Sequence, residues 1–353
     1  MTLSLPRWPL RLLLLLPSLC LLACASHFNP AVSSRPLSYE TAPGASDQRI
    51  LETRDADQLL LFGQWWLPEN PDRPRAVVLM LHGTLVHSGF YAPVAQAYAR
   101  EGYAVFGVDL RGWGQSQGYG RRGNIDSYDE YLEDLKVAHA EVRGRYPDVP
   151  LFIQGESMGG TIALLSQVKQ VVAVDGLILN APAVRPGLYL GPLRTPHWLA
   201  DAGLWGLSLP GRTVPNMPVP VYHPWVERAG VGLMLKEKEN QQRFLNDPHV
   251  THTALPWSYF TGLRKAVREV KAGLDRIDVP VLIQQGTKDV LVPVSSSEYA
   301  HKHLASADKQ LKIYPKLTHG TLHDRRKEEV WADALGWMDE RIGHHAVLTT
   351  AAD

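Results

Sequence analysis

Cysteine is nearly absent from this chain of 353 residues, which contains only Cys20 and Cys24. Two cysteines are too few for a zinc ribbon or a disulfide-stabilised scaffold. A charge excess is also absent, because 36 basic and 36 acidic side chains cancel. A nucleic-acid-binding protein would show a positive surplus or a basic stripe, so we expect no nucleic acid as a partner.

A long hydrophobic run is the third absence. The apolar stretch from Leu12 to Ala23 is interrupted by Pro17 and Ser18. It therefore falls short of the roughly 20 apolar residues that a membrane-spanning helix needs. Arg7 and Arg11 lie at its start, and a positive start followed by a short apolar core is typical of a secretory signal peptide.

The end of this stretch, Leu21-Leu22-Ala23-Cys24, resembles a bacterial lipobox, in which a small residue precedes a cysteine that becomes lipidated. We therefore expect residues 1–23 to be a lipoprotein signal peptide and Cys24 to carry a membrane anchor of several acyl chains. An ordinary signal peptide cut nearby, or an N-terminal anchor, is the alternative. The residues that follow Cys24 resemble those that sort lipoproteins to the outer membrane in two-membrane bacteria. We therefore expect an outer-membrane lipoprotein of the bacterial cell envelope. Residues 24–48 are rich in Pro, Ser, Ala and Gly and are expected to form a tether.

From about residue 49, short apolar segments alternate with helical patterns. The segments typical of buried strands are 76–81, 104–108, 151–153, 177–179, 281–283 and 311–314. Between two of them, Tyr128, Leu132, Leu135 and Val142 fall on one face of a helix that Pro147 ends. This alternation predicts an α/β fold with a mostly parallel sheet and helices on both faces.

Residues 185–257 interrupt the alternation with many prolines and several large apolar side chains. The segment is too apolar for a linker and too interrupted by proline for a strand–helix unit. We expect it to be an inserted cap, or lid; the alternative is an irregular excursion that packs against the sheet edge. The core would then comprise residues 49–184 and 258–343, followed by a loose tail over 344–353.

The pattern Gly-x-Ser-x-Gly occurs twice, around Ser116 and around Ser157. It functions on a sharp turn between a strand and a helix, where small neighbours allow the serine a strained backbone. The second copy follows the strand-like segment 151–154 and precedes the helix-like segment 160–165, whereas loop-like residues follow the first copy. We therefore predict Ser157 as a catalytic nucleophile and Ser116 as a loop residue.

A serine nucleophile needs a base and an acid that orients the base, and in this architecture the acid precedes the histidine. Asp289 follows a strand-like segment that begins at Val281, and His319 follows the next such segment. Both would lie at strand ends, where functional loops gather in α/β sheets. We predict Asp289 and His319 as the other triad members. The weaker alternatives are His323 for the base and Asp278 or Asp308 for the acid.

Negative charge that develops on a substrate carbonyl oxygen needs backbone N–H donors, which form an oxyanion hole. The residue after the nucleophile, Met158, is predicted to supply one donor. The loop after His82-Gly83 is predicted to supply the other, from Thr84 or, as the second choice, Leu85. His82 is expected to be structural, because the base is already assigned. This chemistry requires no metal and no organic cofactor.

Several short motifs spread over residues 50–342 occur here together. They are His82-Gly83, His87-Ser88-Gly89, 101–106, 108–116, Ser157-Met158-Gly159-Gly160, Asn180-Ala181-Pro182, 286–289 and Thr318-His319-Gly320. With them the chain resembles the monoacylglycerol lipase and lysophospholipase branch of the α/β-hydrolases, the serine aminopeptidase S33 or hydrolase-4 family. The resemblance implies a serine carboxylic-ester hydrolase that forms an acyl-enzyme with a small acyl ester or lipid as substrate.

The chain departs from this family at three places. The family usually has histidine where Glu156 and Trp113 stand, and residues 185–257 show little similarity to it. Because a cap shapes the acyl pocket, its divergence affects the substrate more than the reaction. The alternative functions are an amidase, thioesterase or acyltransferase with the same triad, or a lipid-anchored binding protein without catalysis.

Overall fold

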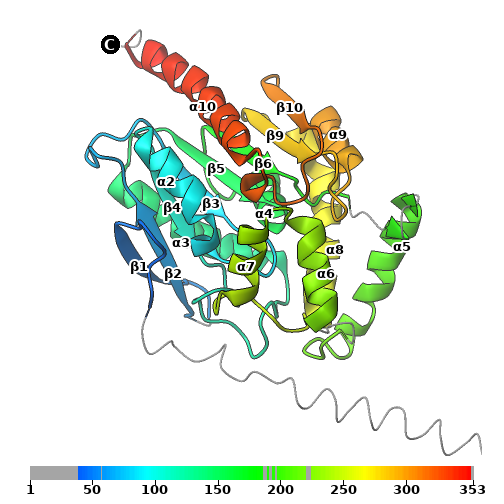
Figure 1. Ribbon diagram of the computed structural model, residues 1–353. Helices are drawn as coiled ribbons and strands as arrows, with labels where there is room; N and C mark the ends of the chain where they lie inside the picture. Colours follow the sequence, from blue (N-terminus) through cyan, green and yellow to red (C-terminus); the bar gives the residue numbers. More distant parts are fainter. Residues whose placement is uncertain are drawn as a thin grey trace, which may run out of the picture.

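The computed structural model describes residues 39–56, 58–185, 189–190, 193–194, 197–219 and 224–350. Its centre is a sheet of eight strands: β1 (Asp47–Glu52), β2 (Leu60–Trp66), β3 (Val77–Leu81), β4 (Ala104–Val108), β5 (Leu151–Glu156), β6 (Gly176–Asn180), β9 (Val281–Gly286) and β10 (Lys309–Tyr314). They lie in the order β1-β2-β4-β3-β5-β6-β9-β10 (Figure 1). The pairs from β4 to β10 are parallel, and β2 pairs antiparallel with β1 and β4.

Helices cover both faces of this sheet (Figure 1). They are α2 (Ala92–Arg100), α3 (Tyr128–Arg145), α4 (Met158–Val168), α8 (Trp257–Gly273), α9 (Val294–His303) and α10 (Lys327–Thr350). Buried side chains of α3, α4, α8 and α9 share one apolar cluster, and those of α2 and α10 share another. Each central strand contributes to both clusters, which is why β3, β4, β5, β6 and β9 are buried along their whole length.

The strands and helices predicted from the apolar pattern are present, and the α/β fold class is confirmed. Helix α3 begins at a capping box, in which the Ser127 hydroxyl and the Glu130 carboxylate accept the first free N–H groups, and it ends before Pro147. The C-terminus differs from the prediction of a loose tail from His344. Helix α10 continues through Thr350, because no proline stops it and each added residue gains a hydrogen bond.

The segment 185–257 lies between β6 and α8 and is largely helical in its described parts. Its elements are β7 (Tyr189–Leu190), β8 (Leu193–Arg194), α5 (His197–Ser208), η3 (Pro210–Arg212), α6 (Pro224–Met234) and α7 (Lys238–Asn246). Prolines begin η3 and α6, a position where the missing N–H costs nothing. Helix α5 packs against α8, and α6 packs against α7 (Figure 1).

The predicted signal peptide, the lipidation site Cys24 and the first part of the tether lie outside the described residues. Within the ranges that the structure describes, no helix is both long and apolar enough to cross a membrane.

Candidate active site

Strand β5 and helix α4 meet at Ser157, whose backbone has φ 52° and ψ −108°. This positive φ is strained for a residue with a side chain. A Cβ on Gly155 would lie 2.5 Å from the carbonyl carbon of Gly159, and a Cβ on Gly159 would lie 2.2 Å from the Leu81 carbonyl oxygen. Glycine at both positions therefore permits the sharp turn that presents Ser157 at the carboxyl end of the sheet.

The second Gly-x-Ser-x-Gly copy has a different environment. The buried Ser116 hydroxyl accepts a hydrogen bond from the Phe62 N–H at 2.8 Å and donates to the Asp109 carbonyl at 2.5 Å. Both contacts fasten its loop to the ends of β2 and β4. Ser116 is a loop residue as predicted, and its hydroxyl makes both of these hydrogen bonds with backbone atoms.

His319 and Asp289 meet after β10 and β9, respectively. The His319 Nδ1 donates to Oδ2 of Asp289 at 2.7 Å, and Oδ1 of Asp289 accepts the N–H groups of Leu291 and Val292 at 2.8 Å each. Burial disfavours a charged His319, but the carboxylates of Asp289 and Glu156 outweigh burial and raise the pKa of His319. The pair is therefore fixed in orientation and suited to accept a proton.

The alternative residues do not form such an arrangement. His323 lies in η5 (Thr321–His323), where burial and then the cations Arg243 and Lys327 lower its pKa well below the ordinary value. Asp308 pairs with Arg341 at the surface, and Asp278 is exposed. Both aspartates precede β10 and β9, at the opposite end of the sheet from Ser157.

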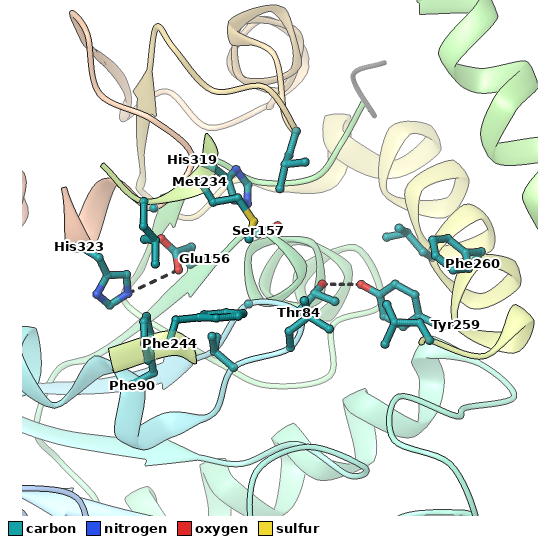
Figure 2. Close-up of a pocket in the computed structure, with 18 of the residues that line it drawn as sticks. Thr84, Phe90, Glu156, Ser157, Met234, Phe244, Tyr259, Phe260, His319 and His323 are labelled. Atoms are coloured by element: carbon teal, nitrogen blue, oxygen red, sulfur yellow. Dashed lines mark hydrogen bonds and ion pairs between the residues drawn. The ribbon is translucent and has the colours of Figure 1, made fainter. Parts of the chain in front are cut away.

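A cavity of about 510 Å³ opens at Ser157 and His319. Figure 2 shows Ser157 between Glu156 and His323 on one side and Thr84, Tyr259 and Phe260 on the other. The segment 185–257 supplies much of the apolar wall through Gly203, Leu204, Met234, Leu235, Phe244 and Leu255. The cavity combines the hydroxyl of Ser157 with apolar walls suited to an aliphatic chain.

The two predicted oxyanion donors lie beside Ser157. The Met158 N–H is the first of α4, so it has no intrahelical acceptor and lies at the positive end of the helix dipole. Thr84 lines the cavity, and its hydroxyl lies 2.5 Å from that of Tyr259. The N–H of Gly83 donates to the Tyr91 hydroxyl at 2.9 Å, so it is already used. The assignment of Thr84 and Met158 as donors stays a prediction.

His82 has the structural environment that we expected. Its Nε2 accepts the Leu110 N–H at 3.0 Å, and its Nδ1 lies 2.8 Å from the Gly83 carbonyl oxygen, which requires the neutral ring. Complete burial lowers the pKa of His82 to about 4. Trp113, where the family usually has histidine, donates from its Nε1 to the Tyr131 hydroxyl at 2.8 Å and packs edge-on to His82.

Glu156 is a site residue to which the sequence assigned no role. Its Oε2 accepts the Tyr91 hydroxyl at 2.5 Å, and its side chain lines the cavity next to Ser157. Burial raises the pKa of Glu156 to about 7, although His319 and the Tyr91 hydroxyl act in the opposite direction. The only signal in the sequence was that Glu156 stands where the family usually has histidine. Its contact with Tyr91 could not be predicted, because Tyr91 lies 65 residues away in the chain.

The described part of the chain contains no group of three or more His, Cys, Asp or Glu side chains placed to hold a metal ion.

Proteins of known sequence and structure resemble this chain over most of its length. A monoacylglycerol lipase of Mycolicibacterium smegmatis is 28% identical over 273 residues, which are 77% of this chain and 90% of that one. The monoglyceride lipase of Rattus norvegicus is 27% identical over 82% of this chain and 89% of its own. The crystal structure of a monoglyceride lipase from Saccharomyces cerevisiae has a TM-score of 0.70 at 20% identity, covering 87% of this chain and 99% of that one.

The structural likeness confirms the α/β-hydrolase fold. Residues 72–326, well over half of the chain, match the family described as serine aminopeptidase, S33. The protein therefore belongs to the serine aminopeptidase S33, or hydrolase-4, family of α/β-hydrolases.

Proposed function

We propose that the protein is a serine ester hydrolase that cleaves monoacylglycerol-like esters. The observation that carries the proposal is one cavity in which Ser157 and the Asp289-bound His319 lie against apolar walls. The names of the relatives, which are lipases of monoacylglycerols, support the substrate class. The segment 185–257 is the cap in this proposal, because it supplies much of the apolar wall of the cavity.

The proposed mechanism begins when Ser157 Oγ attacks the ester carbonyl carbon and transfers its proton to Nε2 of His319. Asp289 holds the ring and stabilises its charged form. The N–H groups of Met158 and Thr84 bind the oxyanion, and losing such a donor costs about 3 kcal/mol of transition-state stabilisation. The alcohol leaves with the proton from His319, and the acyl group stays on Ser157. Water then gives a proton to His319, attacks the acyl-enzyme and releases the acid.

The test is turnover of p-nitrophenyl esters of short and long acids by the wild type and by Ser157→Ala, with Ser116→Ala as the matched control. We expect Ser157→Ala to lose at least about 10⁴-fold in kcat, because no other group can form the acyl-enzyme. Ser116→Ala should keep the activity. Equal turnover by the wild type and Ser157→Ala would refute the proposal.

We also propose that Cys24 carries a lipid anchor that places the cavity next to a membrane of the bacterial envelope, most simply the outer membrane. The support is the sequence pattern that ends in Leu21-Leu22-Ala23-Cys24. The chain would be expressed in a two-membrane bacterium with radiolabelled palmitate. Cys24→Ser should lose the label and the membrane association, whereas Cys20→Ser should keep both, because residue 20 leaves with the signal peptide. Persistent labelling of Cys24→Ser would contradict the anchor.

A further inference from the structure

The cavity has two chemically different sides. On one side, Tyr259 and Phe260 of α8 line the cavity (Figure 2). Three leucines of the lining belong to the same region: Leu263 on α8, Leu255 just before α8, and Leu204 on α5, which packs against α8. On the other side, Glu156 and His323 line the cavity next to the rings of Phe90 and Phe244 (Figure 2). An ester bound with its carbonyl at Ser157 extends in two directions, one for the acyl chain and one for the alcohol. The apolar side suits the chain, so the alcohol faces Glu156 and His323.

The polar atoms on this second side are buried and incompletely paired. The Glu156 side chain is 7% exposed and that of His323 is 3% exposed. Neither Oε1 of Glu156 nor Nε2 of His323 has a hydrogen-bond partner among the residues that the structure describes. The 3.8 Å between Nε2 and Oε2 of Glu156 is too long for a hydrogen bond. Buried polar atoms of this kind cost free energy until a donor or acceptor reaches them.

A carboxylate accepts hydrogen bonds and donates none, so it discriminates between alcohol groups. A hydroxyl group can donate to Oε1 of Glu156. A phosphate brings only acceptor oxygens and a negative charge, and like charges repel strongly where the surroundings are apolar. Phe90, Phe244 and Met234 border this side of the cavity and make its surroundings apolar.

We propose that Glu156 determines the specificity for the alcohol part of the ester, favouring uncharged alcohols with free hydroxyl groups and rejecting those that carry a phosphate. The inference rests on the proposed ester hydrolase function and narrows it to neutral acylglycerols over lysophospholipids. Glu156 acts here on binding and leaves the acyl-transfer steps to Ser157 and His319.

The pH dependence of the discrimination follows from the charge state of Glu156. The titratable groups that face it are Tyr91 from the short 3-10 helix after β3, Asp289 from the loop after β9, His319 from the loop after β10, and His323 from η5. Beyond His323 lie the cations Arg243 and Lys327. Burial raises the pKa of Glu156 to about 7, so its carboxyl is mostly neutral at pH 6 and mostly charged at pH 8. The protonated form no longer repels a phosphate, so selectivity for the neutral ester grows with pH.

The experiment compares two substrates with one acyl group, decanoylglycerol and decanoyl-lysophosphatidylglycerol, each below its critical micelle concentration. The phosphodiester keeps a single charge at these pH values, and the titration of His319 cancels in the ratio of the two kcat/KM values. We expect the ratio, neutral ester over phosphodiester, to rise about tenfold from pH 6 to pH 8 in the wild type. A ratio that stays constant would overturn the proposal without any variant.

The variant Glu156→Gln keeps an oxygen for the Tyr91 hydroxyl and removes the charge. Its ratio at pH 8 should fall about tenfold below that of the wild type and should no longer change with pH. The matched control is Glu239→Gln, which removes an exposed carboxylate on the neighbouring α7 and should leave the ratio at the wild-type value. A Glu156→Gln ratio equal to the wild-type ratio at pH 8 would refute the assignment. A wild type that hydrolyses neither ester would instead refute the proposed function.

Discussion

The loops at the carboxyl ends of the strands and the helices of residues 185–257 contribute to one cavity in different ways. The loops hold Ser157, Asp289 and His319 by glycine-dependent turns and buried hydrogen bonds. The helical segment lines the cavity with apolar residues and leaves large side chains exposed elsewhere, with Trp205 at 50% and Leu233 at 49%. The three polar residues therefore lie on loops at the strand ends, and part of the contact to a substrate chain comes from a separate layer. We therefore expect substitutions in the loops to lower kcat and substitutions in the helical segment to raise KM.

The largest effect on kcat is expected from Asp289→Asn, on the loop after β9. The change removes the charge that orients and stabilises His319, so kcat should fall about 10⁴-fold with little change in KM. The measurement is turnover of a p-nitrophenyl ester, with Asp308→Asn as the control, because Asp308 lies at the opposite end of the sheet beside Arg341. A loss under about tenfold would show that another group holds His319 in place.

The helical segment is tested by Leu204→Ala on α5. Losing a buried leucine wall should raise KM about tenfold for a long acyl chain, which corresponds to about 1.4 kcal/mol, and leave acetate esters unaffected. Trp205→Ala is the matched control on the same helix, because Trp205 is exposed and does not line the cavity. An equal effect of Leu204→Ala on short and long chains would contradict its contact with the chain.

Ser116→Ala changes stability and leaves chemistry intact. The variant leaves the Phe62 N–H without its acceptor in a buried place, so the free energy of unfolding should fall by about 1–3 kcal/mol. Denaturant unfolding followed by circular dichroism measures this, and kcat/KM should stay at the wild-type value. An unchanged unfolding free energy would mean that the loop replaces both hydrogen bonds.

The smallest expected effect is a shift in the pH profile of kcat/KM. The base must be neutral to accept a proton, and the raised pKa of His319 moves the acid limb of the profile to a pH above that of an ordinary histidine. Because Glu156 contributes to this rise, Glu156→Gln should move the limb back toward lower pH. If the acid limb of the wild-type profile lies at the pH of an ordinary histidine, the carboxylates do not raise the pKa of His319.

Much of the core was predictable because its signals are local. A buried parallel strand is apolar along its whole length, so the pattern placed the strands from Val77 to Tyr314 within a few residues. The turn at Ser157 needs glycine on both sides, and the loops carrying Asp289 and His319 follow in a fixed order. The end of α10 was missed, because its last turns have no distinctive pattern of apolar residues.

The sequence by itself determined the parallel sheet and the strand–turn–helix at Ser157, because each depends on neighbours within a few residues. It also predicted Asp289 and His319 as the acid and the base, from their places after successive strands. Only the tertiary structure decided what surrounds them. The contact of Glu156 with Tyr91 joins residues 65 apart, and that of Thr84 with Tyr259 joins residues 175 apart. Such contacts arise when helices pack against strand ends, and no local pattern encodes them. The burial that raises the pKa of Glu156, and with it the proposed choice of alcohol, is a property of the packed molecule.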